Sequence, residues 1–287
     1  MQFISEDLKK FDDSGKNVCV YSPDLLELFV KYTPKDFPEF SSRLFYFWKK
    51  QKRPIPVSVA IKLMNENNVE KINIKSFSVG SGNRIIPPEH NSQFFYFLGL
   101  LLGDGCLVHR KRGQYKNMYH VQISFATKKE AGICRSIVNR LFEINSSIYL
   151  GKGCYNLCIY SKPLVILLNS IYDIPIGEKY SKLHVPKLIK FSSRSLISYF
   201  LKGVFDSDGN IYRYRKGKSV QLRQHSESFI RELRELFSRV GIDFRPPYYD
   251  KANNSWVLWT SKKDLVDNFI KKIINLKLQN APVAQPG

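Results

Sequence analysis

The chain has 287 residues, with 45 Lys+Arg against 25 Asp+Glu and a formal net charge of +20. Its 43% hydrophobic content is enough for a buried core, which excludes wholesale disorder, and no apolar run approaches the ~20 residues that a membrane span needs. Five cysteines without a CxxC pair exclude a disulfide framework and favour buried thiols over a metal site.

The first 85 residues begin with an acidic, mixed segment that fits neither a signal peptide nor a transit peptide. We therefore expect an intracellular, soluble protein, located in the cytoplasm or in a eukaryotic organelle. Three segments then have helical patterns, at 22–32, 41–50 and 57–68. Residues 1–40 hold 5 basic and 8 acidic side chains, whereas residues 41–85 hold 9 and 2. The basic excess thus begins at the second predicted helix.

The run SSRLFYFWKKQKRPIPVSVAIKLM at 41–64 is similar to the Cro/C1-type helix-turn-helix, in which an aromatic, basic recognition helix leads into an apolar helix. The resemblance implies a small all-α DNA-binding domain over 1–85. The basic residues that it would turn toward DNA are Arg43, Lys49, Lys50, Lys52 and Arg53. The alternative is a basic helical adaptor packed on the rest of the protein. The Pro- and Ser-containing stretch 86–92 follows as a linker.

An internal repeat fills the rest of the chain, because FLGLLLGDG at 97–105 resembles LKGVFDSDG at 201–209. A basic stretch without acidic residues follows each copy, at 105–129 and 209–225. Each half continues with strands of alternating character, a helix, two short strands and a final helix. The predicted helices after the repeated segments are 128–142, 163–172, 227–240 and 263–276.

The sequence therefore predicts an α+β fold with two pseudo-symmetric αββαββα repeats, at 93–180 and 181–280. A tail at 281–287 is expected to be disordered.

The small residues of the two repeated segments lie four positions apart, at Gly99 and Gly103 in one copy and at Gly203 and Ser207 in the other. Small residues at this spacing free one helix face of side chains, so that two helix backbones can pack in close contact. Each helix is expected to end at an Asp-Gly pair, whose glycine would take the left-handed conformation.

Asp104 and Asp208 are unusual at these helix ends, because the helix dipole already makes a C-terminus negative. Packing the two helices together would also bring the two carboxylates close to each other. A divalent cation would relieve both penalties. The pair therefore predicts a metal site.

These two segments resemble the motif of the LAGLIDADG homing endonucleases, in the single-chain form that carries two copies. The resemblance covers about 93–280. It implies that the motif helices form the interface between the halves, and that the sheets form a β-saddle along the major groove of double-stranded DNA. It also implies phosphodiester hydrolysis with two or three Mg²⁺ ions.

The resemblance assigns Asp104 and Asp208 as the metal-binding, catalytic acids, with the carbonyls of Gly103 and Ser207 as further ligands. Asp206 matches an earlier motif acid, but Leu102 stands in its place in the first copy, so Asp206 is not assigned to the core chemistry. Family members also have a Gln or Lys at the end of the second strand of each half. The aligned positions are Lys128, or Lys129 if the alignment shifts by one, and His225.

Base and phosphate contacts are expected from outward-facing residues of 106–127 and 210–225, since Arg and Gln make bidentate contacts with guanine and adenine. The candidates are Arg110, Arg112, Gln114, Gln122, Arg213, Arg215, Gln221 and Arg223.

The prediction is a site-specific double-strand DNA endonuclease that acts as a monomer, because both motif copies are in one chain. Two alternatives remain: a transcriptional regulator that keeps the fold without cleavage, and a maturase that binds intron RNA. A regulator would be expected to lack at least one motif acid.

Overall fold

The computed structural model describes residues 1–287 apart from 13–16, 51–52, 80–83, 111–117, 216 and 279–287. Three predicted DNA contacts, Lys52, Arg112 and Gln114, lie outside the described residues, as does the tail at 281–287. Among the described helices, none combines the length and the apolar character of a membrane-spanning segment.

The two repeats have the same order of elements. Repeat 1 consists of α5 (Ser92–Gly103), β6 (Gly105–Arg110), β7 (Met118–Phe125), α6 (Lys128–Phe142), β8 (Ser147–Leu150), β9 (Tyr155–Tyr160) and α7 (Lys162–Ser170). Repeat 2 consists of α9 (Arg194–Asp208), β10 (Gly209–Tyr214), β11 (Gly217–Gln224), α10 (Glu227–Arg239), β12 (Tyr248–Asp250), β13 (Ser255–Thr260) and α11 (Lys263–Phe269), which continues as the π-helix η3 (Ile270–Ile274). The predicted αββαββα order is therefore confirmed in both halves.

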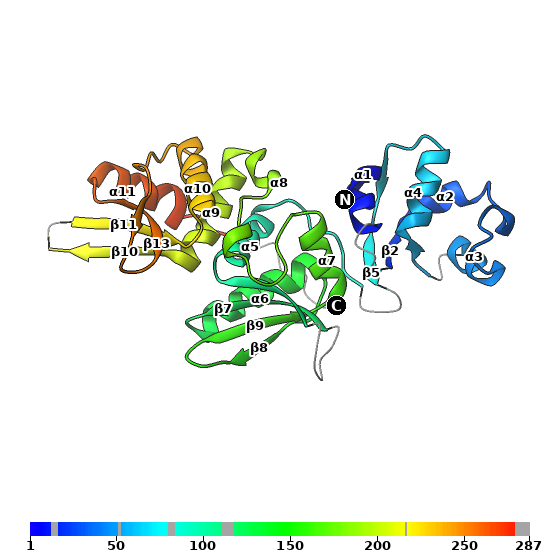
Figure 1. The fold of residues 1–287 in the computed structure, drawn as a ribbon, viewed down its shortest axis with the longest axis horizontal. Helices are drawn as coiled ribbons and strands as arrows, with labels where there is room; N and C mark the ends of the chain where they lie inside the picture. The colour runs from blue at the N-terminus through cyan, green and yellow to red at the C-terminus, as the bar shows by residue number, and fades with distance from the viewer. Residues whose placement is uncertain (13–16, 51–52, 80–83, 111–117, 216, 279–287) are drawn as a thin grey trace.

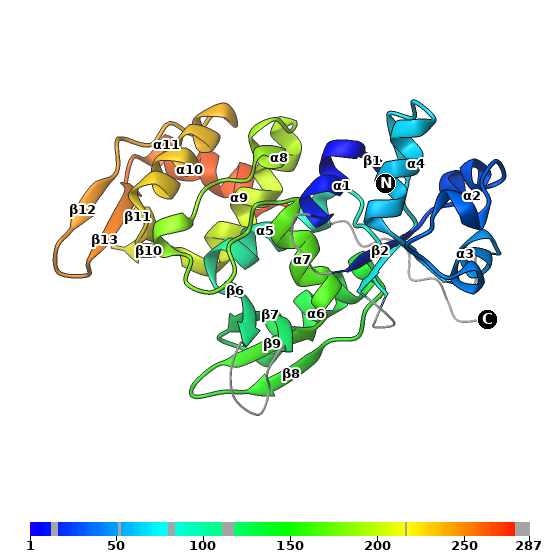
Figure 2. The same ribbon diagram turned by 45° about the vertical axis from the view of Figure 1, so that its right-hand side comes forward.

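Each repeat forms one antiparallel four-stranded sheet, with the equivalent strand orders β6-β7-β9-β8 and β10-β11-β13-β12. Helices α5 and α9 pack against each other between the two sheets (Figures 1 and 2). One face of each sheet packs on helices, as shown by the fully buried side chains of Val121 and Ile159 in repeat 1 and Leu222 and Leu258 in repeat 2. We call the opposite face of each sheet, which does not pack on these helices, the outer face.

The strands begin directly after the motif helices, which leaves Gly105 and Gly209 without the predicted left-handed conformation. Gly209 has φ −98° and ψ 156°, and Gly105 is the first residue of β6. A Cβ atom at Gly209 would lie 2.2 Å from Cδ2 of Phe205, and one at Gly105 would lie 2.7 Å from the Cα of Leu101. Glycine is therefore required because the strand starts against its own helix, not because of its backbone angles.

A connector at 171–193 joins the repeats and contains two short helical segments, η2 (Tyr180–Lys182) and α8 (Lys187–Lys190). Its first part runs along repeat 1, where Ile176 forms an isolated parallel bridge with Leu107 of β6. Figure 1 shows α8 beside α9 and α10, on the repeat 2 side.

The N-terminal segment contains strands as well as helices, so the predicted all-α domain is wrong. Its elements are β1 (Gln2–Ile4), α1 (Ser5–Asp12), β2 (Val18–Tyr21), α2 (Pro23–Phe29), η1 (Pro34–Asp36), α3 (Ser42–Lys49), β3 (Ile55–Pro56), α4 (Val57–Glu66), β4 (Lys71–Asn73) and β5 (Ser76–Val79). Strand β2 pairs with β3 and β5, and β1 pairs with β4. These strands have four residues at most, which is too short for period-2 alternation to show in the sequence.

The three helices predicted in this segment are confirmed as α2, α3 and α4. Residues 30–41, including η1, join α2 to α3, whereas a helix-turn-helix joins its helices with a turn of about three or four residues. The structure therefore does not show a Cro/C1-type helix-turn-helix, although α3 leads into the apolar helix α4 as expected. The segment also contacts repeat 1, since α1 and β5 pack against α7.

Candidate active site

The motif helices α5 and α9 touch through their backbones. A Cβ atom at Gly99 would lie 2.2 Å from the carbonyl oxygen of Phe200, and one at Gly203 would lie 2.2 Å from that of Tyr96. No side chain fits at either position. The prediction that small residues let these two helices approach is therefore confirmed.

The two motif acids lie where these helices end. Asp104 is the C-terminal cap of α5 and Asp208 is the last residue of α9. A Cβ atom at Gly103 would lie 2.6 Å from Oδ2 of Asp208, which places that carboxylate against the end of the other helix. The structure thus brings together Asp104, Asp208, Gly103 and Ser207, the four positions assigned to metal binding.

The electrostatics of this pair favour a cation. Burial, together with the negative charge of Asp104, raises the pKa of Asp208 to about 6. Burial also raises the pKa of Asp104, and the nearby Lys179 ammonium opposes that rise. Two carboxylates that resist ionisation together are strongly stabilised by a positive charge between them.

Lys179, in the connector, supplies such a charge and was missed by the sequence analysis. Its Nζ donates to the carbonyl oxygens of Leu102 and Gly105, each at 2.8 Å, and to that of Gly103. Helix C-termini leave such carbonyls without intrahelical partners. Burial lowers the pKa of Lys179, while the charges of Asp208 and Asp104 oppose this shift.

Gln224, the last residue of β11, contacts the second acid directly. Its Nε2 donates to Oδ2 of Asp208 at 2.7 Å. His225, the residue predicted for this role, is one position too far along the chain. Its Nδ1 lies 2.8 Å from the carbonyl oxygen of Asn254, and its ring packs edge-on against Tyr180.

Two pockets flank the paired helix ends. The repeat 2 pocket, of about 300 Å³, is lined by Gly103, Asp104, Lys179, Tyr180, Asp208, Arg223, Gln224, His225, Asn253 and Ser255. The repeat 1 pocket, of about 390 Å³, is lined by Tyr96, Leu100, Asp104, Ser124, Phe125, Ala126, Glu130, Ile133, Cys134, Asp206 and Ser207. Cationic side chains line only the first among the described residues, so the two halves of the site differ in charge.

Lys128 and Lys129 are not brought to either pocket within the described part of the chain. Both begin α6 with exposed side chains. Asp206 lines the repeat 1 pocket but has structural partners, since it accepts a hydrogen bond from the hydroxyl of Tyr96 at 2.9 Å and pairs with Lys202. The Tyr96 bond ties α5 to α9, and the Lys202 pair lies within α9.

The strand register sorts the candidate DNA contacts by face. In repeat 1, Arg110 and Gln122 share the outer face, because both alternate along their strands with residues of the buried face such as Val121. In repeat 2, Gln221 and Arg223 share the outer face, where Gln221 is buried and Arg223 half-buried, whereas Arg213 lies on the opposite face at the tip of the β10–β11 pair. Arg215 follows β10 and is exposed.

Exposed aromatic side chains accompany the polar residues on the outer face of repeat 2, and the sequence analysis missed them. They are Tyr212, Tyr214, Tyr248 and Trp259. Arg223 is not free there, because its Nη1 donates to Oδ2 of Asp250 at 2.6 Å and this bond lowers the pKa of Asp250.

In the N-terminal segment, Arg43 of α3 and Arg53, which follows that helix, form a cationic cluster, the α3 cluster, around one aromatic ring. The guanidinium groups of Arg43 and Arg53 lie 5.5 Å and 5.3 Å from the ring centre of Phe47. Lys49 is turned back, with its Nζ 3.5 Å from the carbonyls of Val30 and Tyr32, while Lys50 is exposed at the end of the helix.

Comparison with known proteins agrees with this architecture. A family described as a LAGLIDADG-like domain matches residues 195–273. The homing endonuclease I-ApeI of Aeropyrum pernix is 27% identical over 154 residues, which cover 52% of this chain and 66% of that protein. A probable translation initiation factor IF-2 of Methanocaldococcus jannaschii is 26% identical over 248 residues, or 83% of this chain and 19% of the relative.

A second probable IF-2, from Thermococcus kodakarensis, is 25% identical, and the match spans only 12% of its length. Among solved structures, I-DmoI in complex with DNA and Mn is similar with a TM-score of 0.52 and 19% identity, over 66% of this chain and all of that one. Residues 195–273 are therefore similar to the LAGLIDADG-like domain family, and the α+β fold of the chain is similar to that of the homing endonuclease I-DmoI.

Proposed function

We propose that this protein is a site-specific double-strand DNA endonuclease that hydrolyses phosphodiesters with divalent metal ions. The observation that carries the proposal is the meeting of Asp104 and Asp208 at two crossed helix ends, beside Lys179 and Gln224. Nothing in packing alone favours two carboxylates side by side at this point.

The donor set fits Mg²⁺ or a similar hard cation. Carboxylate oxygens from both repeats and the carbonyl of Gly103 are the ligand types that Mg²⁺ prefers. Asp104, Asp208 and Gly103 would hold the ions, with Ser207 adjoining through its bond of 3.3 Å to Oδ2 of Asp208. When bound, such ions supply an activated water near neutral pH and stabilise the leaving oxygen.

The remaining residues of the site would neutralise charge on the phosphate and position the carboxylate of Asp208. The Lys179 ammonium would stabilise negative charge that develops on the phosphate, since it lies beside both acids. Gln224 holds the carboxylate of Asp208 in one orientation through its amide, and His225 with Tyr180 forms the rim of the same pocket. Related proteins support the assignment, since I-DmoI structures are described in complex with target DNA and with Mn or Mg.

The outer faces of the two sheets are proposed to bind the duplex. The contacts would come from Arg110 and Gln122 in repeat 1, from Gln221 in repeat 2, and from the exposed aromatic side chains of repeat 2. Because one chain contains both halves of the site, it should act as a monomer on an asymmetric target. Sedimentation of the complex should give one chain per duplex.

The matched relatives also suggest where such a gene resides. They include an initiation factor and an A-type ATP synthase subunit, and this chain matches only 19% and 18% of their lengths. A segment that occurs in two proteins of unrelated function is not the source of the activity of either protein. We propose that it belongs to a mobile element, such as an intron or an intein.

The test is cleavage of a supercoiled plasmid that carries the uninterrupted host locus. Wild-type protein should linearise it with Mg²⁺ and not with EDTA. Asp104→Asn and Asp208→Asn should each abolish cutting while changing the Kd for the target by less than about tenfold, or ~1.4 kcal/mol. Tight target binding without cutting in any divalent metal would instead indicate a regulator.

A further inference from the structure

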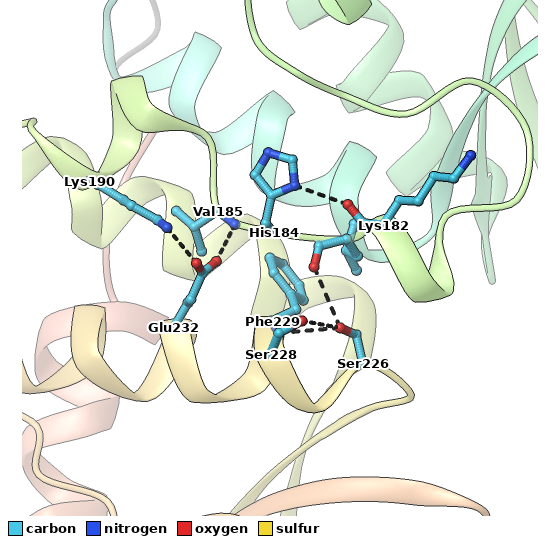
Figure 3. Close-up of polar contacts among 9 residues, drawn as sticks. Lys182, His184, Val185, Lys190, Ser226, Ser228, Phe229 and Glu232 are labelled. Carbon is cyan, nitrogen blue, oxygen red and sulfur yellow. Dashed lines mark hydrogen bonds and ion pairs between the residues drawn. The ribbon is translucent and has the colours of Figure 1, made fainter.

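The connector that carries Lys179 is fastened to both repeats. On the repeat 1 side, the N–H of Gly177 donates to the carbonyl of Leu107 at 2.8 Å. On the repeat 2 side, the N–H of Val185 donates to Oε2 of Glu232 at 2.5 Å (Figure 3). Lys179 lies between these two attachments, so its ammonium depends on both for its position.

The carboxylate of Glu232 accepts two hydrogen bonds from the connector. Figure 3 shows its carboxylate between the backbone of Val185 and the side chain of Lys190, which pairs with Oε1. The side chain of Val185 is fully buried, so its N–H has little access to water as an alternative partner. A charged acceptor makes this the strongest kind of backbone attachment available to the connector.

Glu232 also belongs to the helix that follows Gln224. Ser226 caps the N-terminus of α10, two residues after Gln224, and its Oγ lies 3.5 Å from the carbonyl oxygen of Leu183 in the connector (Figure 3). The first turns of α10 therefore hold both the wall of the site and the connector. A shift of the connector on α10 would move Lys179 relative to Gln224 and Asp208.

We propose that Glu232 is a positioning residue of the active site, which acts by holding the connector so that Lys179 reaches the end of α5. The kinetic consequence rests on the proposed nuclease function. The structural consequence, which is the placement of Lys179, does not.

The placement is tested on the full chain without DNA or metal, by the rate at which an amine-reactive reagent labels Lys179, read by peptide mass spectrometry. Glu232→Ala should speed the labelling about tenfold, because it removes a hydrogen bond to a charged group. Glu232→Gln keeps an acceptor for Val185 and should label nearly as slowly as wild type. Glu235→Ala, which removes an exposed carboxylate one turn later on α10, is the matched control and should match wild type.

Equal labelling of Lys179 in wild type and Glu232→Ala would overturn the proposal. If Glu232→Ala does not fold, hydrogen exchange in the wild type decides instead. The Val185 amide should then exchange at least about 100-fold slower than an unprotected amide. Unprotected exchange would equally overturn the proposal.

The kinetic test is a double-mutant cycle with Lys179→Met under single-turnover conditions at saturating protein. Glu232→Ala should lower the cleavage rate about tenfold to 100-fold, with the Kd for DNA within twofold, because small misplacements at a reacting centre have effects of this size. In the Lys179→Met background it should have no further effect, and Lys190→Met alone should cut at nearly the wild-type rate.

An equal loss in both backgrounds would show that Glu232 does not act through Lys179. Absence of cleavage by the wild type would refute the nuclease function and leave the labelling result as the sole test of placement.

Discussion

Nε2 of Gln224 lies 2.7 Å from Oδ2 of Asp208 and donates a hydrogen bond to it. The equivalent last residue of β7 in repeat 1 is Phe125, whose side chain has no donor to offer Asp104. The two acids therefore have different partners, although their helices are related by the repeat.

This difference predicts unequal cleavage of the two DNA strands. We expect a nicked duplex to accumulate before the double-strand break. Gln224→Leu should slow one strand about tenfold, the effect of losing a hydrogen bond to a charged group, and leave the other unchanged. Separately end-labelled strands would show this, with Glu235→Ala, an exposed position on α10, as the control. Equal slowing of both strands would contradict the assignment.

Asp208→Asn should stabilise the metal-free protein at neutral pH. The folded-state pKa of about 6 lies above the ordinary value of 3.8, so ionisation of Asp208 opposes folding as the pH rises. The free energy of unfolding contributed by this group is highest below pH 4 and falls by up to about 3 kcal/mol by pH 7.

Thermal melts in EDTA should show Asp208→Asn melting above wild type at pH 7.5, with the difference shrinking toward pH 4. The exposed Asp173→Asn variant should melt as wild type does. A melting temperature below wild type at pH 7.5 would mean that the Asp208 carboxylate is already stabilised without metal.

Lys179→Met should reduce the single-turnover cleavage rate about 100-fold, because it removes a fixed positive charge from the phosphate site. The Kd for DNA should change little, since one half-buried cation contributes little to the total contact with the duplex. Lys182→Met, an exposed neighbour in η2, is the matched control. A normal rate in Lys179→Met would remove this residue from the chemistry.

Binding should weaken steeply with salt if the outer faces contact phosphates. With roughly 6–10 contacts, affinity should fall about 10³–10⁵-fold between 50 and 200 mM salt. Arg110→Ala should reduce the log–log slope by about one, whereas Arg213→Ala, from the opposite face, should not. A slope near zero in the wild type would show that these strands are only solvated.

The α3 cluster should add affinity on one flank of the target. We expect Arg43→Ala combined with Arg53→Ala to weaken binding by about 1–3 kcal/mol and to shorten the footprint on one side. The saturated cleavage rate should stay the same, because α3 carries no carboxylate. An unchanged footprint would favour the adaptor role for this segment.

The repeats and their motif acids could be predicted because they recur. Glycine spacing and the alternating pattern of strands are local signals that the fold retains. The helix expected at 128–142 begins and ends as predicted. The short N-terminal strands could not be predicted, since pairing between β1 and β4 depends on segments about 70 residues apart.

The site was predicted only in part for a similar reason. Lys179 lies in an irregular connector, so nothing in its neighbours indicates which of several lysines reaches the helix ends. Gln224 was missed by one residue, because the end of a strand is set by its partners, not by its own sequence. The same limit applies to Arg213, whose face depends on the register of β10 with β11.

The contact between Gly99 and Gly203 is made by backbone atoms. Such an interface requires only that side chains be absent at the contact, and it does not depend on the sequence of the strands on either side. Each sheet is therefore free to diverge without a compensating change in the other. A nuclease with this interface would be able to adapt to a change in one half of its DNA site through substitutions in one repeat alone. The two halves of an asymmetric site would then be accommodated separately.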